Sequence, residues 1–287
     1  MKGFRAKLDA AAKRSNSLLC VGLDPVIERL PTHLRGDDVR ASIVAFNREI
    51  IDATSDLVCC YKPNLGFYVS FGIPGLQALL ETRAMIEPTI PVILDCKLGD
   101  FSNTSAAYAR GIFDAWDFDA VTIAPYMGED GLAPFMSRPD RGVFVLCKTS
   151  NPGSAEFQDL ALASGSADNG DLLFERVAER SRVWDRNHAA SVGLVVGATY
   201  PEHLKRVREI CPDHAILMPG IGEQQGDLAM ALSVGLDANG LGLIPNASRS
   251  VTYVSQERDF ASAARSAAHS VVAAINAGRD AQRFAAR

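Results

Sequence analysis

The 287-residue sequence has no stretch of about 18 consecutive apolar residues and no long run of lysines and arginines. The first absence excludes a membrane-spanning helix. Because basic runs are absent and the formal net charge is -5, the sequence offers no positively charged surface for nucleic acid or an anionic membrane. The N-terminal residues also lack the apolar core of a signal peptide. We therefore expect a cytoplasmic protein that acts on a small molecule, with neither a nucleic acid nor a membrane as partner.

The cysteines and histidines lack the spacings that carry chemistry. None of the six cysteines belongs to a Cys-x-x-Cys pair, and five lie within or at the end of apolar runs, which favours reduced thiols in the core. The five histidines lie outside every motif described below. Their placement argues against a histidine-based catalytic triad and against a histidine-rich metal site.

What the sequence does contain is a series of short apolar runs, each followed by enough chain for a helix. This order is typical of repeated βα units, and eight such units close into a (β/α)8 barrel, a TIM barrel of the α/β class. No linker divides the chain, so we expect a single barrel domain over residues 1–287. The eight runs are residues 18–23, 57–61, 92–95, 120–124, 143–147, 192–196, 215–218 and 238–243.

Amphipathic segments at both ends predict two helices beyond the barrel. Phe4, Leu8 and Ala12 share one face of an N-terminal helix that would close the barrel floor. A C-terminal helix repeats the pattern, with an apolar face made of Phe260, Ala264, Ala267, Val271 and Ala274. Residues 153–169 are rich in small and polar side chains and predict a long active-site loop with some mobility.

The most informative segment is residues 95–104, which begins with two carboxylates and an ammonium after an apolar, β-branched run. An interior strand there sends Asp95 and Lys97 to the same side. Burying such charges costs several kcal/mol per ion unless they are paired, so function explains them better than stability does. The alternative is a structural ion-pair cluster at a strand end. Further polar side chains at or just after the ends of other runs favour a catalytic site: Asp24, Lys62, Ser150, Gln224 and Arg249.

The pattern Asp95-x-Lys97-x-x-Asp100, followed by Asn103 and Thr104, resembles the signature of the orotidine 5'-phosphate decarboxylase family in its longer bacterial branch. The resemblance covers about residues 17 to 255, because residues 148–153, 219–224 and 246–250 are similar to the family's pyrimidine and phosphate loops. It implies a homodimer with shared active sites. It also implies conversion of orotidine 5'-phosphate to uridine 5'-phosphate and CO2, in pyrimidine biosynthesis, without a metal or an organic cofactor.

The same resemblance assigns a role to each matching residue. Lys62, Asp95, Lys97 and Asp100 would form an alternating tetrad in which Lys97 protonates the C6 carbanion. Asp100 and Thr104 would reach into the site of the neighbouring subunit. The residues implied in substrate binding are Asp24, Thr104, Ser150, Gln224, Arg249, Gly220 and Gly222.

Several of these residues also have an ordinary structural interpretation. Arg249 follows the last run, where barrels bind phosphate and a guanidinium can donate two parallel hydrogen bonds, but isolated arginines are often surface residues. Gly220 and Gly222 would let backbone N–H groups approach a phosphate, although Pro-Gly is also a common turn. Ser150 is either a pyrimidine contact or a member of a turn.

Three other functions compete with decarboxylation of the nucleotide. Mg²⁺-dependent sugar-phosphate decarboxylases and synthases share the Asp-x-Lys-x-x-Asp core, but they usually carry an acidic metal ligand at the end of the second strand, where this chain has Lys62. A Schiff-base aldolase is disfavoured, because a lysine between two carboxylates stays protonated. A catalytically silent nucleotide-binding barrel would carry the same binding residues.

Overall fold

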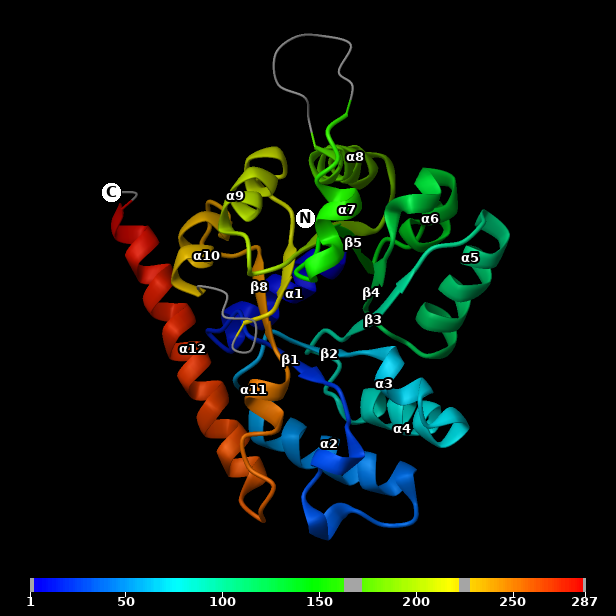
Figure 1. Cartoon of the computed structure of the whole chain (residues 1–287), viewed down its shortest axis with the longest axis vertical. Helices are drawn as coiled ribbons and strands as arrows, with labels where there is room; N and C mark the ends of the chain where they lie inside the picture. Colours follow the sequence, from blue (N-terminus) through cyan, green and yellow to red (C-terminus); the bar gives the residue numbers. More distant parts are fainter. Residues whose placement is uncertain (1–2, 163–171, 222–227, 286–287) are drawn as a thin grey trace.

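The computed structural model describes residues 3–162, 172–221 and 228–285, and these form a closed ring of strands surrounded by helices (Figure 1). Eight parallel strands hydrogen-bond in the order β2-β1-β8-β7-β6-β5-β4-β3. The ring closes through bridges between Tyr61 and Val92 and between Asn64 and Asp95. The predicted (β/α)8 barrel is confirmed. The strands are β1 Cys20–Leu23, β2 Cys60–Pro63, β3 Ile93–Leu98, β4 Ala120–Ile123, β5 Gly142–Lys148, β6 Ser191–Val196, β7 Ile216–Pro219 and β8 Leu243–Ala247.

Each predicted run overlaps an observed strand, although the second run shares only its last two residues with β2, and β8 begins where the predicted run ends. Residues 236–242 form a turn instead, because the Asp237 carboxylate accepts hydrogen bonds from the backbone N–H groups of Asn239 and Leu241. Gly240 and Gly242 occupy the left-handed region of the backbone, with φ of 68° and 76°. The apolar residues of this segment therefore fill a turn, and the strand starts at Leu243.

Helices and helical turns follow the strands and cover the outside of the barrel (Figure 1). Their apolar faces pack on strands that are buried along nearly their whole length, as in parallel sheets covered by helices. They are α1 Gly3–Arg14, η1 Ile27–Arg29, η2 Thr32–Leu34, α2 Val39–Thr54, α3 Leu65–Val69, α4 Gly72–Met85, α5 Ser102–Ala109, η3 Arg110–Ala115, η4 Pro125–Met127, α6 Gly128–Met136, η5 Pro152–Ser154, α7 Ala155–Gln158, α8 Leu173–Asn187, α9 Pro201–Ile210, α10 Leu228–Gly235, α11 Arg249–Thr252 and α12 Phe260–Ala285.

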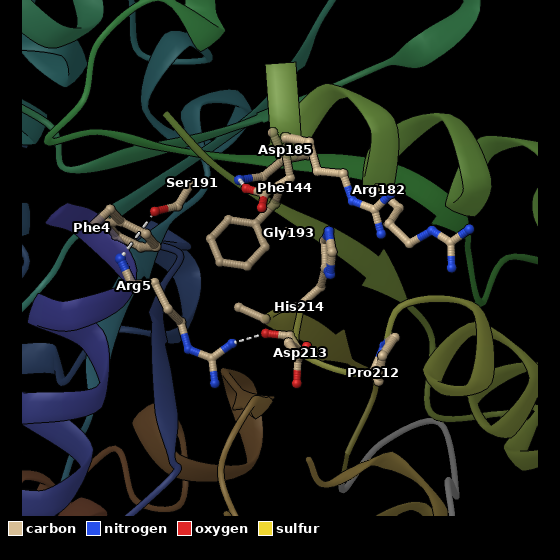
Figure 2. Close-up of a pocket in the computed structure, with 13 residues that line it drawn as sticks. Phe4, Arg5, Phe144, Arg182, Asp185, Ser191, Gly193, Pro212, Asp213 and His214 are labelled. Atoms are coloured by element: carbon tan, nitrogen blue, oxygen red, sulfur yellow. Dashed lines mark hydrogen bonds between the residues drawn. The ribbon is translucent and has the colours of Figure 1, made fainter. Parts of the chain in front are cut away.

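Helix α1 lies across the N-terminal end of the barrel, as its apolar face predicted. Phe4 is buried and packs edge-on against Phe144 of β5, at 5.9 Å between ring centroids. The backbone N–H of Arg5 donates to Ser191 at the start of β6, and the Arg5 guanidinium donates to the carbonyl of Asp213 (Figure 2). A hollow of about 500 Å³ opens beside these contacts, at the end of the barrel opposite to the site described below.

The C-terminal helix is present, but its buried face differs from the predicted one. Phe260 and Ala264 are buried as expected, whereas Ala274 is exposed. Ala268 and Ile275 are buried in place of Ala267 and Ala274. Alanines stand on every side of this helix, so the apolar pattern could not fix its rotation, and α12 packs against α2, α10 and α11.

Two further expectations concern membrane spans and cysteines. Among the residues that the structure describes, none of the helices combines the length and the apolarity needed to cross a bilayer. All six cysteines are free thiols, and five of them are buried.

Candidate active site

Two adjoining hollows open at the C-terminal ends of the barrel strands. The first, of about 270 Å³, is lined by Asp24, Lys62, Gly220 and Arg249 among others. The second, of about 400 Å³, is lined by Lys62, Asp95, Lys97 and Ser150 among others. Lys62 and Pro219 belong to both walls, so the two hollows lie side by side. Residues from six different strand ends thus meet at one place.

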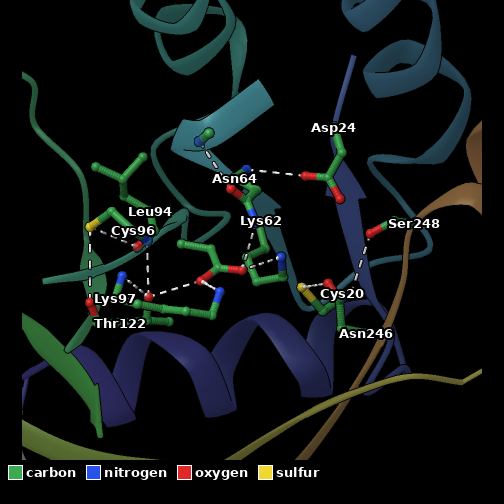
Figure 3. Close-up of polar contacts among 12 residues, drawn as sticks. Cys20, Asp24, Lys62, Asn64, Leu94, Cys96, Lys97, Thr122, Asn246 and Ser248 are labelled. Carbon is green, nitrogen blue, oxygen red and sulfur yellow. Dashed lines mark hydrogen bonds and ion pairs between the residues drawn. The ribbon is translucent and has the colours of Figure 1, made fainter. Parts of the chain in front are cut away.

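Asp95 is the centre of the polar network at this place, and Figure 3 labels its partners Lys62, Asn64, Lys97 and Thr122. Its Oδ2 accepts from Lys62 Nζ at 3.1 Å and from Asn64 Nδ2 at 3.3 Å. Its Oδ1 accepts from Lys97 Nζ at 2.6 Å and from Thr122 Oγ1 at 2.9 Å. Each carboxylate oxygen therefore has two donors, which occupies the acceptor capacity of the group and leaves it a single orientation.

Electrostatics hold this network in its charged form. Burial alone would raise the pKa of Asp95, but the ammonium groups of Lys62 and Lys97 outweigh burial, and the pKa lies well below its ordinary value. Burial would lower the pKa of Lys62, but the charges of Asp95 and Asp24 outweigh it and raise that pKa above its ordinary value. Asp95 is therefore an anion between two cations, and Lys97 is the most exposed of the three, with 45% of its side chain accessible against 11% for Asp95 and 5% for Lys62.

The backbone of Lys97 is strained, with φ of 49° in the left-handed region that favours glycine. The β3–β4 ladder shifts register between Leu94 and Leu98, so Lys97 does not continue a regular strand. The expected shared side of Asp95 and Lys97 is observed, but a bulge brings the two side chains together rather than simple alternation.

The first hollow has the features of an anion site. Gly220 follows β7 with φ of 100°, a conformation that a residue with a side chain rarely adopts, and Arg249 follows β8 on the same wall. Gly22 of β1 lies against this wall, since a Cβ atom on it would stand 1.9 Å from Ser248 Oγ. A glycine is needed there for the loop after β8 to approach the first strand.

The segment after β5 forms the wall of the second hollow. Ser150 and Asn151 line it, and Gln158 of α7 reaches back to donate to Thr149 Oγ1 at 2.8 Å and to accept from the Thr149 N–H. The predicted long loop is therefore partly helical over residues 152–158. The rest of the predicted loop, residues 163–169, lies outside the described part of the chain.

Two of the predicted site residues do not join this cluster within one chain. Asp100 accepts a hydrogen bond from the N–H of Phe101, and among the described residues it makes no ion pair with Lys97. Thr104 lies on α5 and lines a separate apolar groove with Leu98 and Tyr108. The predicted residues Gly222 and Gln224 lie outside the described part of the chain.

Sequence reasoning missed Asn64, Thr122 and Gln158. Asn64 donates to Asp95, and its backbone N–H donates to Asp24 Oδ1 at 3.1 Å, so it joins two predicted site residues. Thr122 was visible as the one hydroxyl in an otherwise apolar strand next to β3. No sequence pattern pointed to Gln158, because its contact with Thr149 forms only when the loop after β5 folds back.

The strand-end charges and the anion-type loops after β7 and β8 define the class of the protein, a (β/α)8-barrel enzyme. Comparison with known proteins gives the family. The model of the orotidine 5'-phosphate decarboxylase / HUMPS family matches residues 17–266, and the chain belongs to this family.

Individual relatives match over nearly the whole length. An orotidine 5'-phosphate decarboxylase of Thermomicrobium roseum is 51% identical over 268 residues, which cover 93% of each chain. Among solved structures, the orotidine 5'-monophosphate decarboxylase of Leishmania donovani is 41% identical with a TM-score of 0.82, covering 97% of this chain and 99% of the other. A putative orotidine-monophosphate decarboxylase from Toxoplasma gondii is 37% identical with a TM-score of 0.89, covering 100% and 99%.

Proposed function

We propose that the protein decarboxylates orotidine 5'-phosphate to uridine 5'-phosphate and that Lys97 is the proton donor. The observation that carries the proposal is the fixed array Lys62–Asp95–Lys97, in which one carboxylate lies between two ammonium groups. Relatives named orotidine 5'-phosphate decarboxylase match 93% and 92% of the chain.

The shape of the site suits a nucleotide. Its two adjoining hollows offer an anion-type wall with Arg249 and Gly220 in one and the charged array in the other. A substrate that spans both would hold its phosphate near Arg249, its ribose near Asp24 and Lys62, and its pyrimidine near Ser150. Gln224 and Gly222 would complete the phosphate loop.

The array suits the chemistry of the reaction. When the bond from C6 to the carboxylate breaks, CO2 leaves and the electron pair stays on C6, where the ring has no adjacent carbonyl to delocalise it. The Lys97 ammonium, held by Asp95, stabilises that charge as it forms and then gives its proton to C6. Lys97 regains a proton from solvent after the product leaves.

The strongest rival is a Mg²⁺-dependent sugar-phosphate barrel. The position at the end of β2 argues against it, because Lys62 Nζ lies 3.1 Å from Asp95 and places a positive charge where those relatives carry an acidic metal ligand. A cation next to this ammonium would be repelled.

We further propose a homodimer whose two subunits share their active sites. Asp100 lies outside its own cluster, and two aromatic side chains that follow β3 and β4 are exposed to solvent, Phe101 by 70% and Tyr126 by 91%. Tyr108 and Thr104 line an apolar groove nearby, of about 340 Å³. Apolar surface of this kind marks interfaces, and a second copy would bury it while bringing Asp100 and Thr104 to its neighbour's site.

An absorbance assay with orotidine 5'-phosphate tests the function directly. The purified protein should consume the substrate and release CO2, and the Lys97→Ala variant should lose at least about 100-fold in kcat while still binding uridine 5'-phosphate. A wild-type protein that binds the nucleotide without turnover would instead be a silent binding barrel. A strict requirement for added Mg²⁺ would favour the sugar-phosphate rival.

A further inference from the structure

Thr122 is a buried threonine of β4 whose single hydroxyl makes three short hydrogen bonds. Its Oγ1 accepts from the backbone N–H groups of Cys96 and Lys97, both at 2.9 Å. It also donates to Asp95 Oδ1 at 2.9 Å. The directions follow from the chemistry, because backbone N–H groups can only donate and an ionised carboxylate can only accept.

We propose that Thr122 is a positioning residue for the reaction, which fixes the strained backbone of Lys97 and orients the Asp95 carboxylate through one hydroxyl. This inference rests on the proposed function for its kinetic part. Thr122 stands at the wall of the second hollow but is only 1% exposed, so its action on the reaction passes through Asp95 and Lys97.

The need for such a residue arises from the bulge in β3. Leu94 pairs with Val121 and Leu98 pairs with Ile123, so four residues of β3 lie opposite two residues of β4. The carbonyl groups of β4 therefore no longer face the intervening N–H groups of β3. Thr122 Oγ1 receives two of those N–H groups instead. A left-handed residue such as Lys97 persists only when its surroundings hold it, and here the hydroxyl provides the contact.

The same hydroxyl sets the orientation of Asp95. Because its lone pairs receive two N–H groups, its only hydrogen points to Asp95 Oδ1, the oxygen that also holds the Lys97 ammonium at 2.6 Å. The Thr122 hydroxyl thus holds the backbone of Lys97 directly and its side chain through Asp95. The carboxylate cannot rotate away from Lys97 without losing this bond.

A matched pair of variants separates the hydroxyl of Thr122 from its methyl group. Thr122→Val keeps the shape and removes the hydroxyl, whereas Thr122→Ser keeps the hydroxyl and removes the methyl. In Thr122→Val we expect kcat to fall by about 10-fold to 100-fold, as for a misplaced catalytic group. We expect KM and the Kd for uridine 5'-phosphate to change by less than about 3-fold, because the binding groups stay in place. The serine variant should recover kcat to within about 5-fold of wild type.

Amide hydrogen exchange gives a readout that does not depend on turnover. The amides of Cys96 and Lys97 should exchange at least about 10-fold faster in Thr122→Val than in wild type or Thr122→Ser, while amides of β6 stay unchanged. A valine variant with wild-type kcat and wild-type exchange would overturn the inference. A serine variant as slow as the valine variant would do the same, because the methyl packing would then be what matters.

The two proposals fail in different ways. If wild-type protein has no activity on orotidine 5'-phosphate, the proposed function fails, and the exchange rates of the two amides still decide whether Thr122 fixes Lys97. If wild type is active and the valine variant has wild-type kcat and wild-type exchange, the positioning role fails alone.

Discussion

The ammonium of Lys148 contacts both carboxylate oxygens of Asp159, at 2.7 and 2.8 Å, and joins the end of β5 to the residue that follows α7. Lys148 is almost fully buried, with its side chain 1% exposed. Its Nζ also donates to Ser154 Oγ at 3.2 Å and lies 5.1 Å from the centre of the Tyr200 ring. This pair closes a loop whose residues line the second hollow, so it holds the wall of the site in place.

We predict that Asp159→Asn raises KM for orotidine 5'-phosphate with a smaller effect on kcat. The neutral amide cannot hold the buried ammonium as a carboxylate does, and a charge-assisted hydrogen bond of this kind contributes about 1.5 to 3 kcal/mol. The loop would then have to be ordered by the substrate, which weakens binding of ground state and transition state alike. Steady-state kinetics separate the two parameters.

Glu156→Gln is the matched control for that experiment. It makes the same change of charge in the same loop, at an exposed position. It should leave KM and kcat unchanged. Equal effects of the two variants would mean that the charge of the loop matters and the pairing with Lys148 does not.

A second prediction concerns the anion-type wall. Arg249→Ala should lower kcat/KM, with a loss of transition-state stabilisation of about 2 to 5 kcal/mol, because a guanidinium donates charge-assisted hydrogen bonds to a phosphate. With orotidine, which lacks the phosphate, the same substitution should have little effect. Arg258→Ala removes a nearby exposed arginine that does not line either hollow and serves as the control. If the variant loses as much activity on orotidine as on the full substrate, Arg249 has a structural role.

The pKa of Asp95 predicts how the fold responds to acid. The lysines lower this pKa below its ordinary value of 3.8, so the ionised carboxylate stabilises the folded state. That contribution is complete above the ordinary value and is lost as pH falls toward the lower pKa of the folded protein. The difference in free energy of unfolding between wild type and Asp95→Asn should therefore shrink as pH falls from about 6 to about 3 in urea titrations. Parallel curves for the two proteins would contradict this origin of the shift.

The sequence predicted the barrel and the strand-end positions of Asp24, Lys62 and Asp95, because apolar runs and charges at their ends follow from local pattern. It could not predict the partners of these residues. Thr122 joins Asp95 only because β4 pairs with β3 and β3 bulges at Lys97. The sequence also could not predict the start of β8, because the preceding turn depends on the two hydrogen bonds that Asp237 accepts from the backbone.

For the same reason, residues of a proposed interface are harder to predict from the sequence than residues of the core. Phe101 and Tyr126 do not pack in the core, since they are 70% and 91% exposed. In the proposed dimer a second copy would bury both side chains, and the sequence of one chain does not specify that contact.

The last prediction tests whether Asp100 serves the partner's site while Lys97 serves its own. Lys97→Ala and Asp100→Ala homodimers should both be inactive. In a mixed dimer, one pocket would carry both defects and the other neither. Co-refolding equal amounts gives half heterodimers with one working site of two, so the mixture should reach about a quarter of wild-type activity. Tagged subunits and size-exclusion chromatography establish that heterodimers are present. Heterodimers as inactive as their parents would mean that Asp100 acts within its own subunit, and the shared site would have to be abandoned.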